Sequence, residues 1–172
     1  CLVGLFELLM EKKDFEEAYD VVKKIARYFP ANPKRMGQIL KLAIMTKSYE
    51  DIERYYQTFT ELDERGDELI KYICAALVVC GKFYLRTKYN KRAMELFKKA
   101  GTTAAGRVKI LREIITSLAE YEMPKEAAEF LDRFPADEKG KVDFMAMDYL
   151  INSKLTPASS IVDSGRKLLK AN

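Results

Sequence analysis

Apolar residues recur every three or four positions along most of this chain, which is the spacing of one face of an α-helix. Ala18, Val22 and Ile25 form one such stripe, and short breaks separate ten stripes in all. We therefore expect an all-α protein. The expected helices cover residues 2–12, 14–29, a segment opening at 33, a segment opening after 48, and then 69–86, 90–101, 103–121, 124–134, 141–152 and 157–170.

The breaks between the stripes contain residues that begin and end helices. Asp14, Ser48 and Asn90 have side-chain oxygens that can accept hydrogen bonds from the free amides of a first turn. In the Asn32-Pro33 pair the asparagine can cap a helix and the proline ring suits the first helical position. Gly101 is expected to end the helix that starts at Asn90.

The fifth and sixth expected helices contain a set of residues at repeat-like spacing. Small residues let two antiparallel helices approach closely, and large ones fill the groove between consecutive pairs. Around the anchor Ala93 the set consists of Leu77, Gly81, Tyr84, Ala93, Phe97 and Ala100, and the corresponding anchors of the other pairs are Ala18, Ile52, Ala127 and Ala158. The steps from Ala18 to Ile52 and from Ala93 to Ala127 are 34 residues, and the step between them is 41.

This pattern resembles the tetratricopeptide repeat, which has a period of about 34 residues. Leu77 and Cys80 depart from it, since the repeat has Trp and Leu there. The resemblance implies a right-handed α-solenoid of about five antiparallel helix pairs, whose first helices line a concave, peptide-binding surface. It also implies scaffolding rather than catalysis. The chain would form one domain, 1–172, with approximate repeats 1–32, 33–66, 67–106, 107–140 and 141–172.

A second resemblance, without a diagnostic motif, is to the helical output regions that follow the receiver domain in some bacterial response regulators. Residues 5–24, 32–36 and 107–115 are the segments that resemble them. This resemblance implies a role in signal transduction.

The composition agrees with a helical binding protein and disfavours an enzyme. Hydrophobic residues make up 48% of the chain and charged residues 33%, with only 8 Gly and 5 Pro, which disfavours disorder and a multi-stranded β fold. The chain has no histidine, so the most common general base and most zinc sites are absent. We expect no catalytic activity, no metal and no cofactor.

The three cysteines are too few for a disulfide framework. Cys74 and Cys80 lie in an apolar stripe and are expected to be reduced core residues of a cytoplasmic protein. Lys71 and Lys82 interrupt that stripe, so it is too short to cross a membrane. The chain shows no signal peptide and begins at Cys1 without methionine, and we expect it to be a fragment of a longer polypeptide.

Six basic residues are expected on the exposed side of the first helices. Positive charge clustered on a concave surface attracts an acidic segment or a terminal carboxylate, so we expect an acidic protein or peptide partner. A helical-repeat protein that binds nucleic acid is an alternative, although 30 basic and 26 acidic residues nearly balance. These side chains could also simply solvate the surface. The six residues are Lys34, Lys41, Lys82, Arg86, Lys109 and Arg112.

The ends of such a stack are expected to be apolar, because each helix pair leaves a surface for the next one. The first expected helix is apolar on nearly all sides, with Leu2, Leu5, Phe6 and Leu9 available for contact. Apolar patches of this kind are rarely open on a soluble monomer. We expect a homodimer through this end, or coverage by further segments of the polypeptide.

Overall fold

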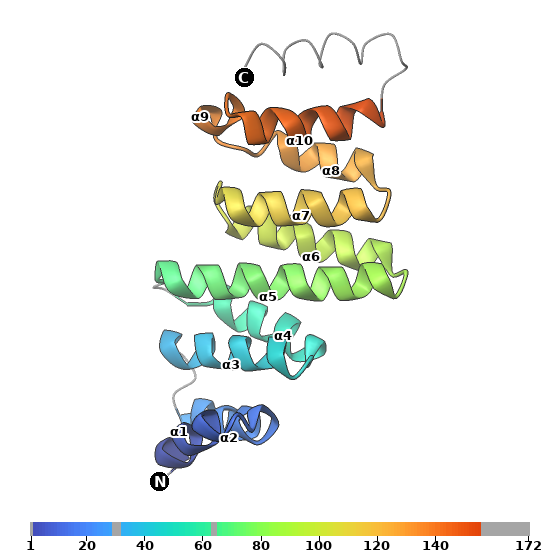
Figure 1. The fold of residues 1–172 in the computed structure, drawn as a ribbon. Coiled ribbons are helices and arrows are strands. Elements are labelled where there is room, and N and C mark those ends of the chain that lie inside the picture. The colour runs from blue at the N-terminus through green and yellow to red at the C-terminus, as the bar shows by residue number, and fades with distance from the viewer. Residues whose placement is uncertain (1, 29–31, 63–64, 156–172) are drawn as a thin grey trace.

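The computed structural model describes residues 2–28, 32–62 and 65–155, and all regular secondary structure in these ranges is helical (Figure 1). The all-α prediction is confirmed. None of the described helices combines the length and apolar composition needed to cross a bilayer. The helices are α1 (Leu2–Lys12), α2 (Phe15–Tyr28), α3 (Pro33–Met45), α4 (Tyr49–Thr60), α5 (Asp67–Arg86), α6 (Asn90–Thr103), α7 (Val108–Glu120), α8 (Pro124–Leu131), α9 (Ala136–Lys139) and α10 (Val142–Ser153).

The helices stack in pairs to form a solenoid (Figure 1). α1 packs on α2, α3 on α4, α5 on α6 and α7 on α8. The first helices α3, α5 and α7 contact one another in order and form one layer, whose outer surface we call the first-helix face. α10 packs against α8 and continues the stack, while the expected helix over 157–170 lies outside the described residues.

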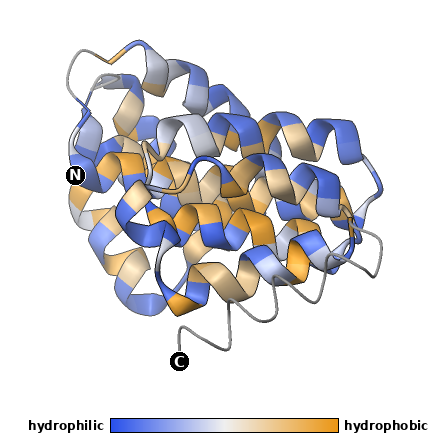
Figure 2. Ribbon diagram, turned by 90° about the horizontal axis from the view of Figure 1, so that it is seen from above, coloured by the Kyte–Doolittle hydropathy of each residue, from blue (hydrophilic) through white to orange (hydrophobic). Residues whose placement is uncertain are grey.

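The apolar interior lies between the layers of helices. Figure 2 shows hydrophobic residues gathered inside the stack and hydrophilic residues around its outside. The anchors Ala18, Ile52, Ala93 and Ala127 are completely buried, and Ala158 lies outside the described residues. Equivalent positions therefore pack into the core in four successive pairs, although the step from Ile52 to Ala93 is longer than the repeat.

The repeat-like residues of α5 and α6 pack against one another. Phe97 of α6 lies so close to α5 that a Cβ built on Gly81 would be 2.5 Å from one of its ring carbons. Tyr84 is half-buried, and its ring meets the ring of Phe83 edge-on with centroids 5.4 Å apart. The remaining members of the set, Leu77, Ala93 and Ala100, are completely buried.

Two of the predicted helix caps are confirmed. At the start of α2 the amide of Glu17 donates to Oδ1 of Asp14 at 3.2 Å. At the start of α3 the amide of Arg35 donates to Oδ1 of Asn32 at 3.1 Å, with Pro33 at the first helical position.

The other two predicted caps make no capping hydrogen bond. Ser48 stands before α4, but its hydroxyl shares a 2.9 Å hydrogen bond with the hydroxyl of Thr46. Asn90 is the first residue of α6 rather than its cap. In the case of Ser48, the hydroxyl has another local partner and therefore does not accept from the free amides of α4.

The prediction that Gly101 ends a helix is wrong. α6 continues to Thr103, and the chain turns at Gly106, which has a φ of +79°. Gly101 is buried, and a Cβ built there would lie 3.0 Å from a ring carbon of Phe130 on α8. It is a position of close approach between successive helix pairs.

Boundaries near this turn also differ from the prediction. α7 begins at Val108 rather than at 103, and α8 ends at Leu131 rather than at 134. The four-residue α9 was not predicted. A single turn of this length contains too few residues to show a periodic stripe.

Candidate functional site

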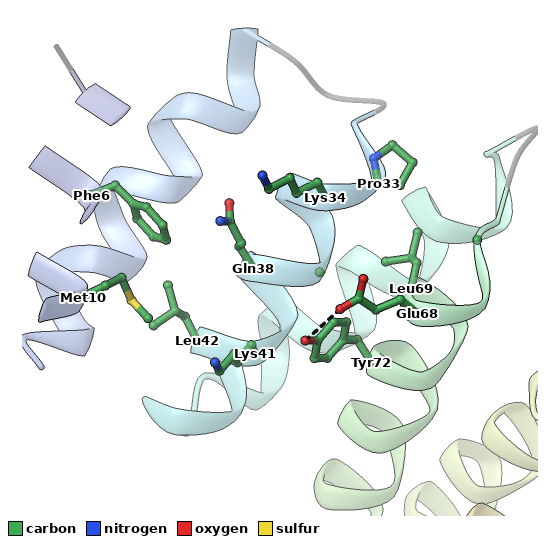
Figure 3. A pocket seen from close by; sticks show the side chains of 12 residues that line it. Phe6, Met10, Pro33, Lys34, Gln38, Lys41, Leu42, Glu68, Leu69 and Tyr72 are labelled. Carbon is green, nitrogen blue, oxygen red and sulfur yellow. Dashed lines mark hydrogen bonds between the residues drawn. The ribbon is translucent and has the colours of Figure 1, made fainter. Parts of the chain in front are cut away.

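Three first helices enclose a pocket of about 500 Å3 on the first-helix face, which we call the first-helix pocket (Figure 3). Phe6 and Met10 reach into it from α1. Leu42 of α3 lies beside Met10, and Leu69 and Tyr72 line it from α5. The walls are therefore mainly apolar, as expected of a site that buries part of a ligand.

Helical spacing on α3 places three polar side chains along this pocket. Lys34, Gln38 and Lys41 are separated by four and three positions, so they share one face of the helix (Figure 3). Both lysines are exposed, and neither forms an ion pair with any residue that the structure describes. The pocket thus combines an apolar interior with two lysines free to meet an acidic group.

Gly37 lets α3 and α5 approach each other at the pocket. A Cβ at Gly37 would lie 3.2 Å from a ring carbon of Tyr72, so a larger residue would push against that ring. The Tyr72 hydroxyl donates a 3.4 Å hydrogen bond to Oε1 of Glu68, one turn earlier on α5. This carboxylate is on the α5 side of the pocket, away from the apolar side chains of α1 (Figure 3).

Two other predicted binding residues are engaged within the chain. The Nζ atom of Lys82 on α5 lies 2.8 Å from Oε1 of Glu113 on α7. The Nη1 atom of Arg112 on α7 lies 3.2 Å from Oδ2 of Asp143 on α10. A partner that used either cation would have to compete with these carboxylates.

The six predicted basic residues do not gather into one cluster. Lys34 and Lys41 line the first-helix pocket. Arg86 is the last residue of α5 and Lys109 lies in the first turn of α7, and both are exposed without an ion pair among the described residues. The structure therefore brings together only the two lysines of α3.

Sequence reasoning missed the acidic partners on the neighbouring helices. Both ion pairs join residues 31 positions apart, and a third with the same separation joins Lys98 of α6 to Glu129 of α8 at 3.4 Å. A separation about one helical turn shorter than the repeat links equivalent faces of successive pairs. A basic residue followed 31 positions later by an acidic residue was therefore the sequence signal for these ion pairs.

The two buried cysteines are poor candidates for a reactive site. Burial raises the pKa of the Cys74 thiol to about 11 and that of Cys80 to about 12. A protonated, buried thiol is a poor nucleophile and a poor metal ligand. In the described part of the chain no three or more His, Cys, Asp or Glu side chains are grouped to hold a metal ion.

Stacked helix pairs, buried anchors at repeat spacing and a pocket on the first-helix face define a tetratricopeptide-like helical-repeat fold. No protein-family model and no curated protein matches the sequence. Among solved structures, the crystal structure of MamA protein is similar with a TM-score of 0.61 and 15% identity, covering 99% of this chain and 89% of the other. The structure of the MamA RS-1 ArsTM double mutant is similar with a TM-score of 0.52 and 14% identity, covering 99% and 92%.

At these identities the likeness shows the fold alone, and it agrees with the tetratricopeptide-like prediction. It does not show the resemblance to response-regulator output regions, which stays a prediction.

Proposed function

We propose that this protein is a non-catalytic interaction module that holds a segment of a partner protein in the first-helix pocket. The observation that carries the proposal is the pocket itself, in which apolar side chains from three helices lie beside Lys34 and Lys41. Apolar burial supplies affinity in such sites, and a few polar groups at the edge orient the ligand.

The partner segment that fits this pocket presents a large apolar side chain next to acidic groups. Burying one Leu, Ile or Phe side chain in this pocket, beside the partly exposed Met10 and Tyr72, stabilises a complex by about 1.5–3 kcal/mol. Lys34 and Lys41 lie two helical turns apart, about 10 Å along α3. That spacing suits a segment with two acidic residues, or with one acidic residue and a C-terminal carboxylate.

Nucleic acid is the less favoured ligand for this face. A polynucleotide needs a series of cations that follow its phosphates. Lys82 and Arg112 are already paired with carboxylates, so the predicted basic stripe is interrupted.

Selection from a random peptide library tests the proposed peptide site. Peptides that bind the wild-type protein should share an apolar residue flanked by Asp or Glu. Their affinity should fall by roughly tenfold or more in Lys34→Glu with Lys41→Glu, because both charges are reversed at the pocket. The matched control, Lys91→Glu with Lys125→Glu on α6 and α8, should bind as the wild type does. A selection without acidic residues, or an equal loss in both variants, would place the site elsewhere.

We also propose that the outer side of α1 is covered by a second copy of the chain. Phe6 and Leu9, which were expected among the end contacts, face the interior and are buried. Leu2, Leu5 and Leu8 are instead 37%, 40% and 46% exposed and follow one another at three-residue spacing. This stripe of leucines is the surface available for a homodimer.

A further inference from the structure

A second cavity, of about 570 Å3, lies between α2, α3 and α4, and we call it the α2–α4 cavity. Arg35, Met36 and Ile39 line it from α3. These positions lie on the opposite face of α3 from the residues of the first-helix pocket, so the two cavities are separate.

The lining of this cavity is strongly basic. It has five cationic side chains and two carboxylates, an excess of three positive charges. The cations come from all three helices, with lysines and an arginine on α2 and one arginine each on α3 and α4. They are Lys23, Lys24, Arg27, Arg35 and Arg54, and the carboxylates are Asp20 and Asp51.

Both carboxylates are engaged within the protein. The hydroxyl of Tyr19 donates to Oδ2 of Asp51 at 2.7 Å, and Nη2 of Arg54 lies 3.4 Å from Oδ1 of the same carboxylate. Nζ of Lys23 lies 3.0 Å from Oδ1 of Asp20. Burial and the hydrogen bond to Asp51 hold the pKa of Tyr19 well above its usual range, so the tyrosine stays protonated as a donor.

Three cations of the cavity have no carboxylate partner among the described residues. Lys24 and Arg27 lie three positions apart on α2, and Arg35 lies on α3. One nitrogen of Arg35 donates a 2.8 Å hydrogen bond to Oε1 of Gln38. Because a guanidinium carries five N–H groups, Arg35 keeps donors for a ligand.

We propose that the α2–α4 cavity binds a phosphate monoester group. Such a group carries about two negative charges at neutral pH and three strong acceptor oxygens, whereas a carboxylate neutralises one cation only. The planar fork of an arginine can bind two phosphate oxygens at once, and Arg27 and Arg35 reach the cavity from different helices. Tyr55 and Thr58 also line the cavity, and their hydroxyls can act as further donors.

The surroundings favour a single phosphate group over a polynucleotide. Beyond the cavity, the charged residues that link the second helices are paired. Arg92 of α6 binds Glu53 of α4, and Lys98 of α6 binds Glu129 of α8. Lys24, Arg27 and Arg35 are gathered at this one cavity, and the paired Arg92 and Lys98 interrupt any continuous track of free cations along the second helices on which successive phosphates could lie.

Nuclear magnetic resonance titration of the isotope-labelled chain tests this site with defined probes. The probes are inorganic phosphate, phosphoserine, a peptide pool with central phosphoserine and random flanks, the same pool unphosphorylated, and single-stranded RNA. Inorganic phosphate, phosphoserine and the phosphorylated peptide pool should shift amide signals confined to residues 20–27, 35–39 and 51–58. The unphosphorylated pool should not shift them.

Two variants link the signals to the arginines. Arg27→Gln with Arg35→Gln should weaken phosphoserine binding by roughly tenfold or more. Arg27→Lys with Arg35→Lys keeps the charge and removes the fork, and it should lose part of this affinity. Lys91→Gln with Lys125→Gln is the matched control and should bind normally. Lys34→Glu with Lys41→Glu should also bind phosphate normally, which separates this proposal from the peptide site.

The outcomes separate the sources of the phosphate from failure of the proposal. Affinity for the phosphopeptide pool at least tenfold above that for phosphoserine would indicate a phosphorylated protein, and equal affinities would indicate a small phosphorylated molecule. The absence of localised shifts with every phosphate probe would overturn the proposal. So would unchanged binding by the glutamine variant when its thermal unfolding matches the wild type, or tighter binding of RNA than of the monoesters.

Discussion

At Gly81 the absence of a side chain allows α5 and α6 to touch. The 2.5 Å distance between a Cβ built there and the ring of Phe97 is shorter than any real carbon contact. A side chain at this position must displace either the ring or the backbone, and both are buried. The repeat-like spacing of small and large residues is thus a steric requirement of this helix pair.

Gly81→Ala is therefore expected to destabilise the protein by about 1–3 kcal/mol, because overpacking a filled core forces side chains from their rotamers. Chemical denaturation monitored by circular dichroism measures the change. Gly140→Ala is the control, since nothing lies within 4 Å of a Cβ there, and its effect should be small. Adding Phe97→Leu to Gly81→Ala should recover part of the loss, and strictly additive effects would contradict the contact.

The buried thiols predict how stability depends on pH. The pKa values of Cys74 and Cys80 are raised by burial from the ordinary value of 9.0, so these groups favour the folded state below pH 9. The free energy of unfolding should then fall as the pH rises from about 9 towards 11, because the unfolded chain ionises its thiols first. Cys74→Ala with Cys80→Ala should show a shallower fall over the same range. An equal slope in both proteins would mean that the thiols are not the cause.

Between elements, ion pairs connect successive repeats on both layers. In the pair of Lys82 with Glu113 the side chains are 38% and 45% exposed, so solvent screens the attraction. Pairs of this kind typically contribute about 0.2–1 kcal/mol each. Because all three pairs join residues 31 positions apart, they connect equivalent faces of successive helix pairs, but each contributes little to stability.

A double-mutant cycle on Lys82 and Glu113 measures this coupling. Lys82→Glu should lower stability because it sets two carboxylates against each other, and adding Glu113→Lys should restore most of the loss. The coupling should be below about 1 kcal/mol and should shrink at high salt. If the charge-swapped protein regained no stability, the ion pair would not contribute to the stability of the fold.

The whole molecule has a buried interior and an apolar first end. On α1 the residues facing α2 and α3 are covered, while the leucine stripe of Leu2, Leu5 and Leu8 is exposed. Since each pair of a solenoid buries apolar surface against a neighbour, the exposed leucines of α1 offer a surface that a further contact would bury.

Sedimentation equilibrium tests the proposed dimer. The wild-type chain should associate in a concentration-dependent way, and Leu5→Glu with Leu8→Glu should shift it to the monomer because charges would be buried in the interface. Tyr121→Glu, at a residue that is 40% exposed after α7, should not change the association. A wild-type chain that stays monomeric at high concentration would exclude this interface.

The class of fold and much of the register of its helices could be predicted from the sequence. The periodic stripes predicted the main helices because burial of one face is a local property of helical spacing, and the buried anchors followed from the same periodicity. The exposed position of Lys34 and Lys41 on one face of α3 also followed from it, and their role in binding stays a prediction. The role of Gly101, in contrast, could not be predicted, because a glycine is compatible both with the end of a helix and with the close approach of a neighbouring ring.

Which charged side chains are free, and where the cavities lie, depends on how the helices pack against one another. Lys82 and Arg112 look like Lys34 and Lys41 in the sequence, but the stacking of helix pairs places a carboxylate beside each of the former. The two cavities on either side of α3 likewise depend on how α1, α2, α4 and α5 are set around it. The ion pairs and the cavities form between residues that are about one repeat apart in the sequence. The electrostatic energy of such a pair depends on a separation of a few ångströms, which the local periodicity of the sequence does not specify.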